Sequence, residues 1–303
     1  GAETFPRNIA KNWRLVQDNP YIIGDFSWTG WDYIGEAGIG KIDYSGGSAI
    51  RFNFFGDYPW LLAWCGDIDI TGCRRPASYY REIVFGLRKE PYIAVQRPEH
   101  YHDTAAPSPW GWSDSVAGWT WPGFEGKPVK VEVYSDTAEV ELLLNGVSLG
   151  RQKAGEKNGF KAEFDTVYQP GKLEAVAWSS GKERGRCLLE SASGEATLDT
   201  RVDRETIGAN DRDLAFVEIA LTDGRGNLWH NLRKKIAVEV EGTGELLGFG
   251  SADPASEENC FDTTRSVFDG RALAVIRPKE AGKIRVTVSA DNCESVTREI
   301  QVV

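Results

Sequence analysis

The stretch GDFSWTGWDYIGE, at residues 24–36, holds the side chains of this chain that are best suited to chemistry. It follows the apolar run Tyr21–Ile23 directly. It is too apolar for an ordinary loop and too acidic for a plain core segment. The end of this run is therefore the first candidate site, and it combines two tryptophans with three carboxylates: Trp28, Trp31, Asp25, Asp32 and Glu36.

A second aromatic concentration lies in the segment TAAPSPWGWSDSVAGWTWPGFEGKP. A surface that stacks sugar rings is one interpretation. A buried wedge between domains is the other, and we favour it because large aromatic side chains bury the most area where two domains meet. Exposed rings would support the first interpretation and buried rings the second. The four tryptophans concerned are Trp110, Trp112, Trp119 and Trp121.

The chain has few residues that could bind a metal or act as a histidine base for a nucleophile. The chain has 3 histidines, and the H-x-H pair His100 and His102 stands in a polar stretch, so we predict neither a metal nor a cofactor. The 5 cysteines are widely spaced and show no C-x-x-C pair. An odd number without metal-ligand spacing predicts buried or free thiols rather than a disulfide framework.

Charge and hydropathy exclude two classes of partner. A formal net charge of -10 argues against nucleic acid, because neutralising phosphates needs an excess of lysine and arginine. The longest apolar runs have the length of a strand and fall well short of the ~20 residues of a membrane span. We therefore predict no membrane partner.

The first hundred residues predict helix, strand, long loop and helix. The first helix is expected over residues 4–19, capped by Thr4 and ended by Asn19-Pro20. The run 21–28 has the unalternating apolar character of a parallel strand that is covered on both faces. A second helix is expected from Pro76 to before Pro91. Helix, parallel strand and helix form a piece of an α/β fold.

From Lys127 onward the apolar period changes to two. Alternating valines and leucines separated by turn signals, such as Asn145-Gly146, predict short antiparallel strands. We expect two consecutive all-β sandwiches of the immunoglobulin-like kind, at residues 127–192 and 193–303. Residues 107–126 form a tryptophan- and proline-rich linker or wedge before them.

Several long motifs resemble glycoside hydrolase family 2, most closely its bacterial β-galactosidase branch. The resemblance implies a (β/α)8 TIM barrel, of which residues 1–106 would be the C-terminal portion, from the end of strand seven to helix eight. In that branch, sandwich domains follow the barrel. The segments that carry the resemblance are Asn19–Gly40, Trp64–Arg81, Pro109–Gly123 and Val129–Gly150.

The same resemblance assigns roles to Trp28 and Glu3, and the position of Asp32 and Glu36 just beyond Trp28 suggests a role for these two. Trp28 matches the tryptophan that forms the floor of the sugar subsite, with a non-proline cis bond implied between Ser27 and Trp28. Asp32 and Glu36 would bind sugar hydroxyls, although bracing of the loop by carboxylate-to-backbone hydrogen bonds is the alternative for both. Glu3 matches the catalytic nucleophile. From its position alone it would be an ordinary acidic residue near a helix N-terminus.

A retaining glycosidase needs a second carboxylate as acid/base, about 5–5.5 Å from the nucleophile. In this family the second carboxylate lies on the fourth barrel strand, which this chain lacks. We therefore expect a C-terminal fragment of a retaining exo-β-glycosidase, most simply a β-galactosidase, that is inactive alone. Its partners would be a carbohydrate substrate and either the remainder of the barrel or another copy of the chain. The alternative is a non-catalytic carbohydrate-binding or interaction module.

Overall fold

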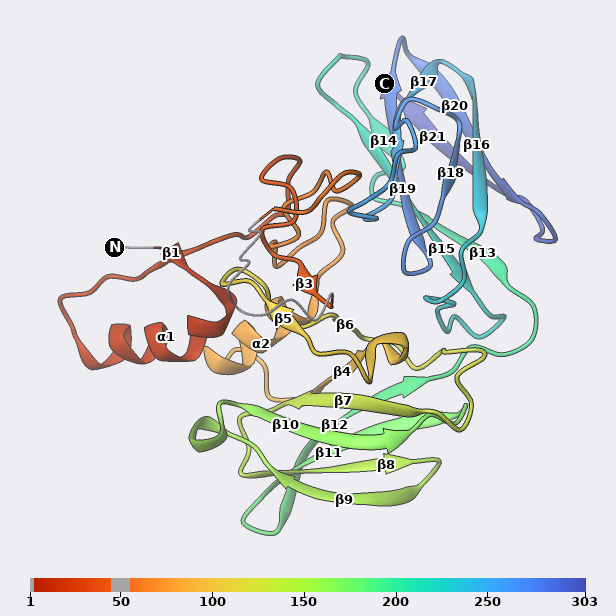
Figure 1. Cartoon of the computed structure of the whole chain (residues 1–303). Coiled ribbons are helices and arrows are strands. Elements are labelled where there is room, and N and C mark those ends of the chain that lie inside the picture. Colours follow the sequence, from red (N-terminus) through yellow and green to blue (C-terminus); the bar gives the residue numbers. More distant parts are fainter. Residues whose placement is uncertain (1–2, 45–54) are drawn as a thin grey trace. The chain divides into compact units, whose positions relative to one another are not determined.

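The structure is a computed structural model that describes residues 3–44 and 55–303. The chain divides into two compact units, at residues 1–191 and 192–303 (Figure 1). The first unit combines a mixed N-terminal region with a β-sandwich, and the second is a β-sandwich. The predicted β-sandwiches are present, and the fold consists mostly of sandwich domains with few helices.

The N-terminal region begins with the short strand β1 (Glu3–Thr4), a 3-10 turn (Pro6–Asn8) and helix α1 (Ile9–Asp18). The prediction that Thr4 caps this helix was wrong. Proline at the start of the 3-10 turn delays the α-helix by one turn, so Asn8 takes the N-cap position and Thr4 lies in β1. Helix α1 ends as expected, with Asn19 at its C-cap.

The strand expected over residues 21–28 is reduced to β2 (Phe26–Ser27). β2 pairs in parallel with β1, and the two form a two-stranded sheet. The expectation that both faces of this segment are covered was also wrong for this chain, because Tyr21 and Ile23 are exposed. The remaining elements of this region are β3 (Ile42–Asp43), α2 (Pro76–Val84) and β5 (Ala106–Pro107).

The first sandwich consists of two four-stranded sheets with the orders β10-β7-β4-β6 and β12-β11-β8-β9. It begins earlier in the chain than residue 127. Strand β4 lies in the range assigned to the barrel, and β6 lies in the range assigned to the linker. The strands are β4 (Tyr92–Gln96), β6 (Ser115–Val116), β7 (Pro128–Tyr134), β8 (Glu139–Leu144), β9 (Val147–Lys153), β10 (Lys161–Val167), β11 (Lys172–Ser179) and β12 (Lys182–Glu190).

The sheet that contains β4 and β7 is covered on both faces. Side chains alternate across a strand, so Ile93 and Val95 of β4 enter the core between the two sheets. Tyr92 and Ala94 face the other way and pack with apolar residues of α1 and α2. This explains why β4 shows no alternation of apolar and polar residues.

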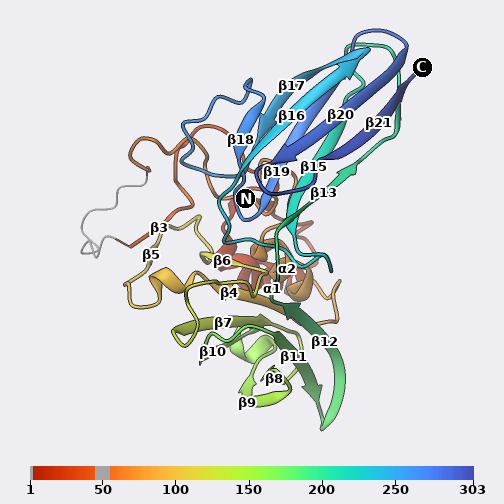
Figure 2. The ribbon, with the colours of Figure 1, turned by 90° about the vertical axis from the view of Figure 1, so that its right-hand side faces the viewer.

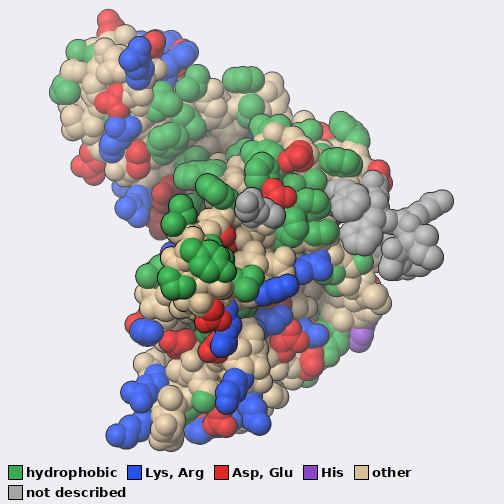
Figure 3. All heavy atoms as spheres, turned by 90° about the vertical axis from the view of Figure 1, so that its left-hand side faces the viewer, with side chains coloured by type: hydrophobic (Ala, Val, Ile, Leu, Met, Phe, Trp, Pro, Cys, Tyr) green, Lys and Arg blue, Asp and Glu red, His purple; other side chains and the backbone are tan. Residues whose placement is uncertain are grey.

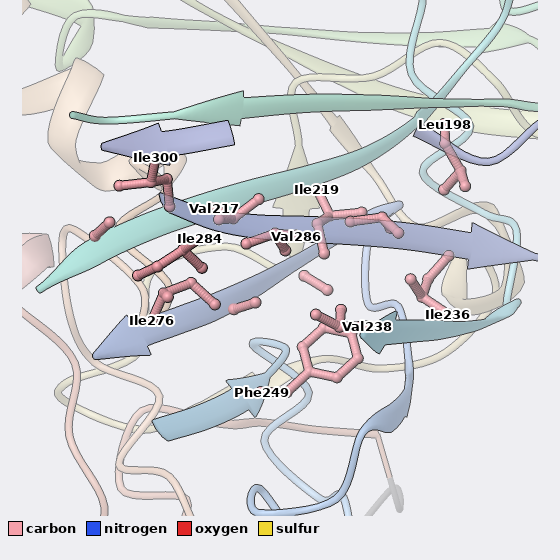
Figure 4. Packing of buried hydrophobic residues seen from close by; sticks show 14 of the residues in the cluster. Leu198, Val217, Ile219, Ile236, Val238, Phe249, Ile276, Ile284, Val286 and Ile300 are labelled. Atoms are coloured by element: carbon pink, nitrogen blue, oxygen red, sulfur yellow. The ribbon is translucent and has the colours of Figure 1, made fainter. Parts of the chain in front are cut away.

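The second unit pairs the sheet β13-β15-β19-β17 with the sheet β14-β21-β20-β16-β18. Strands β16, β20 and β21 run side by side (Figure 2). Aliphatic side chains and Phe249 fill the core between the sheets (Figure 4). The strands are β13 (Thr197–Val202), β14 (Thr206–Ile207), β15 (Ala215–Thr222), β16 (Lys235–Gly242), β17 (Gly244–Gly250), β18 (Thr264–Ser266), β19 (Arg271–Pro278), β20 (Gly282–Ala290) and β21 (Val296–Val302).

The five cysteines are thiols that form no disulfide bond within the described residues, which agrees with the predicted buried or free thiols. Burial, followed by the neighbouring Asp32 charge, raises the pKa of the Cys65 thiol to about 12, so this thiol stays protonated at neutral pH. Among the residues that the structure describes, no helix is long and apolar enough to cross a membrane.

Candidate active site

The parallel pairing of β1 and β2 brings the two ends of the predicted site together. Glu3 is the register partner of Phe26, and Thr4 is the partner of Ser27. The Trp28 N–H continues this ladder by donating to the Thr4 carbonyl oxygen at 3.2 Å. Because register partners of a parallel pair share a face, Phe26 points to the side of the sheet that carries Glu3, and Trp28 follows two residues later.

Buried polar contacts fix this strand pair beside α1. The Thr4 hydroxyl donates to Asp25 Oδ2 and accepts a hydrogen bond from Asn12 Nδ2 at 2.8 Å. Asp25 thus has a structural role in this strand pair. Glu3 itself stands outside the first turn of α1, which begins at Ile9. Its alternative role of stabilising the helix terminus therefore loses its geometric basis, since that effect falls off within the first turn.

The loop after Trp28 is held by a second segment of chain. Backbone hydrogen bonds join residues 29–40 to residues 61–68, for example from Asp32 N to Ile68 O at 2.8 Å and from Ala63 N to Tyr33 O at 3.0 Å. The two segments approach so closely at Gly66 that a Cβ there would lie 2.4 Å from Asp32 N. Glycine at residue 66 is required for this approach.

The non-proline cis peptide lies between Trp28 and Thr29. The expected position, between Ser27 and Trp28, was wrong by one residue. The Trp28 N–H is engaged in the ladder with β1, so the departure from the strand begins after Trp28 rather than before it.

The Trp28 indole lies at the surface and is 37% exposed. Its Nε1–H donates to the Tyr33 hydroxyl at 3.2 Å, and the two rings meet edge to face with centroids 6.2 Å apart. The Tyr33 hydroxyl in turn donates to Glu36 Oε2. The structure thus brings Trp28 and Glu36 together through a tyrosine that the sequence interpretation did not single out.

Asp32 lies apart from this surface cluster and is only 4% exposed. Its Oδ1 accepts the backbone N–H groups of Cys65 at 3.1 Å and Gly66 at 3.3 Å. Burial raises the pKa of the Asp32 carboxyl above its ordinary value, and the Arg75 guanidinium and the backbone amides offset part of that rise. In this structure Asp32 braces the loop.

Two replacements of Asp32 distinguish the effect of its hydrogen bonds on stability from the effect of its charge. Asp32→Ala should lower the free energy of unfolding by about 1–3 kcal/mol, because two buried N–H groups lose their acceptor. Asp32→Asn keeps an acceptor oxygen and removes the buried charge, so it should be far milder. Denaturant unfolding of both variants provides the measurement.

The raised pKa of Asp32 predicts how the stability difference between Asp32→Asn and the native chain changes with pH. Because its folded pKa is raised, Asp32 contributes its full stabilisation below its unfolded pKa and loses that contribution as the pH rises through the folded value. The stability of Asp32→Asn relative to the native chain should therefore increase from acidic to neutral pH. A decrease over that range would contradict the raised pKa.

Sequence reasoning also missed a set of arginine contacts behind the loop. Arg75 stacks over the Trp64 ring at 4.1 Å and donates to the Gly66 carbonyl oxygen at 3.2 Å. Arg81 donates to both carboxylate oxygens of Asp67, at 2.6 Å and 3.3 Å. The sequence does contain a signal for these contacts, because arginines and aspartates are concentrated before and within α2, in the stretch DIDITGCRRPASYYR.

The tryptophan cluster does not form a sugar-stacking surface. Trp119 and Trp121 are buried in the core of the first sandwich. Trp110 packs against the apolar residues of the loop that includes Tyr33, and Trp112 donates to the Tyr134 hydroxyl at 2.8 Å. Trp110 and Trp112 pack against residues of the N-terminal region, which agrees with the wedge interpretation for these two rings, whereas Trp119 and Trp121 belong to the sandwich core.

The His100 side chain takes part in local packing, and the described residues hold no candidate metal site. His100 stacks on Tyr44 with ring centroids 3.8 Å apart, and its Nδ1 lies 2.7 Å from Asp103 Oδ2. No group of three or more His, Cys, Asp or Glu side chains within residues 3–44 and 55–303 is placed to hold a metal ion.

The N-terminal region exposes many large hydrophobic side chains. Hydrophobic side chains gather on the exposed face of the N-terminal region (Figure 3). A monomeric soluble protein rarely leaves so many large apolar side chains of one region in water. This surface is typical of one that another part of a protein covers. Its exposed members are Tyr21, Ile23, Phe26, Trp31, Ile34, Tyr58 and Leu61.

Two family models match the chain. Residues 198–299 match the glycoside hydrolase family 2 C-terminal domain 5, and residues 126–185 match a domain of unknown function, DUF4982. A glycosyl hydrolase family 2 member from Bacteroides cellulosilyticus superposes on the whole chain with a TM-score of 0.88 at 32% identity. A β-glycosidase from Bacteroides vulgatus has the same fold, with a TM-score of 0.71.

Two curated proteins are also similar. A Formosa agariphila protein that bears the name of a β-glucuronidase is 26% identical over 93% of this chain. A β-galactosidase of Bacteroides ovatus is 25% identical over 95% of it. The chain spans 24% and 29% of the lengths of these two proteins, and 39% of the Bacteroides cellulosilyticus structure.

Proposed function

Because this chain carries a C-terminal domain of glycoside hydrolase family 2, we propose that it is the C-terminal part of a retaining exo-β-glycosidase with Glu3 as nucleophile. The observation that carries the proposal is the parallel pairing of β1 with β2. It sets Glu3 in register with Phe26, two residues before the exposed indole of Trp28, which supports a site shared by the two residues. A carboxylate beside a flat aromatic ring is the arrangement needed to attack a sugar that rests on that ring.

In the proposed reaction Glu3 attacks the anomeric carbon and the glycosidic oxygen leaves. A second carboxyl group, supplied in its protonated form by a part of the protein outside this chain, donates its proton to that oxygen and becomes a carboxylate. The same group then removes a proton from water, which hydrolyses the glycosyl ester and returns Glu3 to its carboxylate form. Trp28 supplies the floor for the sugar, and Glu36 accepts a hydrogen bond from a sugar hydroxyl through Oε1.

We further propose that β1 and β2 are the seventh and eighth strands of a (β/α)8 barrel. Parallel pairing of consecutive strands connected through a helix is the repeating unit of that fold. The exposed apolar face around β2 would then pack against barrel strands of the intact protein. The two sandwiches would be immunoglobulin-like domains that follow the barrel.

A neutral sugar is the substrate class that the local charges favour. Apart from the buried Asp32, the acidic groups on the strand pair and the loop after it are Glu3, Asp25 and Glu36, and they would repel a uronate carboxylate. Arg75, at the start of α2, is a cation beside this loop, but its guanidinium is engaged by the Trp64 ring and the Gly66 carbonyl oxygen. We therefore favour a terminal β-galactoside over a β-glucuronide.

The alternative function, a non-catalytic carbohydrate-binding module, has less support. It would rely on exposed aromatic rings of the tryptophan cluster or of a sandwich, whereas Trp119 and Trp121 are core residues. A module of that kind would also leave the pairing of Glu3 with the Trp28 segment without a purpose.

A comparison of this chain with an N-terminally extended form tests the proposal. On aryl β-glycosides, the extended protein should hydrolyse the galactoside faster than the glucuronide, and the 303-residue chain should hydrolyse neither. Equal rates from both proteins would place the acid/base within this chain. Preference for the glucuronide would refute the substrate class, and inactivity of the extended protein on every sugar would refute the enzyme.

A further inference from the structure

We propose that Tyr33 is a positioning residue, which fixes the plane of the Trp28 indole through a directed hydrogen-bond relay that ends on Glu36. The inference deepens the proposed function and rests on it, because it concerns the ring assigned as the floor of the sugar subsite. Neither the sequence motif nor its family resemblance assigned a role to Tyr33.

The relay has one direction because of its chemistry. An indole N–H can only donate, and the Trp28 Nε1–H donates to the Tyr33 hydroxyl at 3.2 Å. The hydroxyl has a single proton, which it donates to Glu36 Oε2. The lone pairs of the hydroxyl are thereby left to face the indole. A carboxylate is a strong acceptor, so it strengthens this orientation.

The two acceptors of the relay, Tyr33 and Glu36, are both held in place by the loop. The Tyr33 ring packs against the small apolar cluster of Ile39, Ala63 and Cys65, and its carbonyl oxygen accepts the Ala63 N–H at 3.0 Å. Glu36 occupies the left-handed region at φ +43°, and its carbonyl oxygen accepts the Ile39 N–H at 3.0 Å. A firmly held tyrosine thus restrains a tryptophan that is open to solvent.

The edge-to-face geometry adds a second restraint on the same ring. The interplanar angle of 88° sets the indole perpendicular to the tyrosine ring. Rotation of the indole about its side-chain bonds would break both this contact and the hydrogen bond. Burial, followed by the hydrogen bond to Glu36, raises the pKa of the Tyr33 hydroxyl, so the relay keeps its proton in the neutral range.

The consequence is that Tyr33 should affect substrate binding more than the chemical step. In the N-terminally extended protein, Tyr33→Phe keeps the ring and removes the acceptor of the indole N–H. We expect KM for an aryl β-galactoside to rise about fivefold, the size of one lost hydrogen bond, while kcat stays within about twofold. Glu36→Gln keeps an acceptor for the Tyr33 hydroxyl and should change the indole environment less.

A spectroscopic measurement tests the relay independently of activity. The extended protein is labelled with 15N in tryptophan only, so that its indole N–H signals are resolved, and Trp28→Phe assigns the Trp28 signal. Tyr33→Phe should move that signal upfield and speed its exchange with solvent. Tyr101→Phe is the matched control, because it removes a tyrosine hydroxyl that donates to a carboxylate, Asp165 Oδ1, at 3.3 Å elsewhere in the unit.

Each outcome decides one of the two claims. A Trp28 signal that does not move in Tyr33→Phe overturns the relay, whatever the activity. A signal that moves while KM is unchanged overturns the positioning role. A signal that moves in a protein that hydrolyses no glycoside refutes the proposed function and leaves the relay standing.

Discussion

The Glu3→Gln variant of the N-terminally extended protein is expected to lose glycoside turnover by roughly four powers of ten. The amide has the shape of the carboxylate, but it cannot form the glycosyl ester. Ground-state binding of the sugar on Trp28 should therefore remain largely intact. Initial rates on an aryl β-galactoside and equilibrium binding of a non-hydrolysed analogue measure the two quantities separately.

A covalent label identifies the nucleophile directly. A 2-fluoro sugar with a good leaving group forms a slowly hydrolysed ester, and mass spectrometry should locate it on Glu3. Glu36→Gln is the matched control, since it removes a carboxylate on the loop that follows Trp28 and should leave the label on Glu3. Label on Glu36 in the native protein would overturn the assignment. The melting temperature of Glu3→Gln should equal that of the native protein, because Glu3 lies outside the first turn of α1.

Trp121→Ala is expected to lower the free energy of unfolding of the first sandwich by about 3–5 kcal/mol, the usual cost of removing a large aromatic side chain from a core. Trp121 is 0% exposed and lies among the valines of β7 and the leucines of β8. Denaturant unfolding monitored separately for the two units provides the measurement. The transition of residues 192–303 should not move and serves as the internal reference.

The comparison for this variant is Trp31→Ala in the 303-residue chain. Trp31 is 57% exposed, so its removal should change stability by less than about 0.5 kcal/mol. Native stability in Trp121→Ala, together with weakened binding of a soluble oligosaccharide, would restore the sugar-stacking interpretation of the tryptophan cluster.

The sandwiches could be predicted because a strand with one buried face shows alternating apolar and polar residues in its sequence. Val129, Val131 and Val133 alternate with polar residues and all enter one core. β4 escaped prediction for the opposite reason. Its sequence YIAV is buried on both faces, so it carries no period and resembles a barrel strand.

The candidate site could be located but not resolved from the sequence. Residue types and family resemblance selected the loop after Trp28, and the structure brings aromatic and acidic side chains of this loop into contact. Glu36 is exposed and Asp32 is buried, and this difference depends on the segment 61–68 that folds over the loop. That segment lies some thirty residues away in the chain, and no local pattern encodes the contact.

The membership of β4 in the sandwich sheet has a practical consequence for anyone who recombines this protein with a homologue. A crossover after Gly126 would separate β7 from β4, its register partner from Tyr92 to Val95, and would leave the tyrosines on the helix side without their neighbours. The first sandwich and the two helices are therefore inherited as one block. The permissive junction for a chimaera is Ser191–Ala192, where the two compact units meet in sequence.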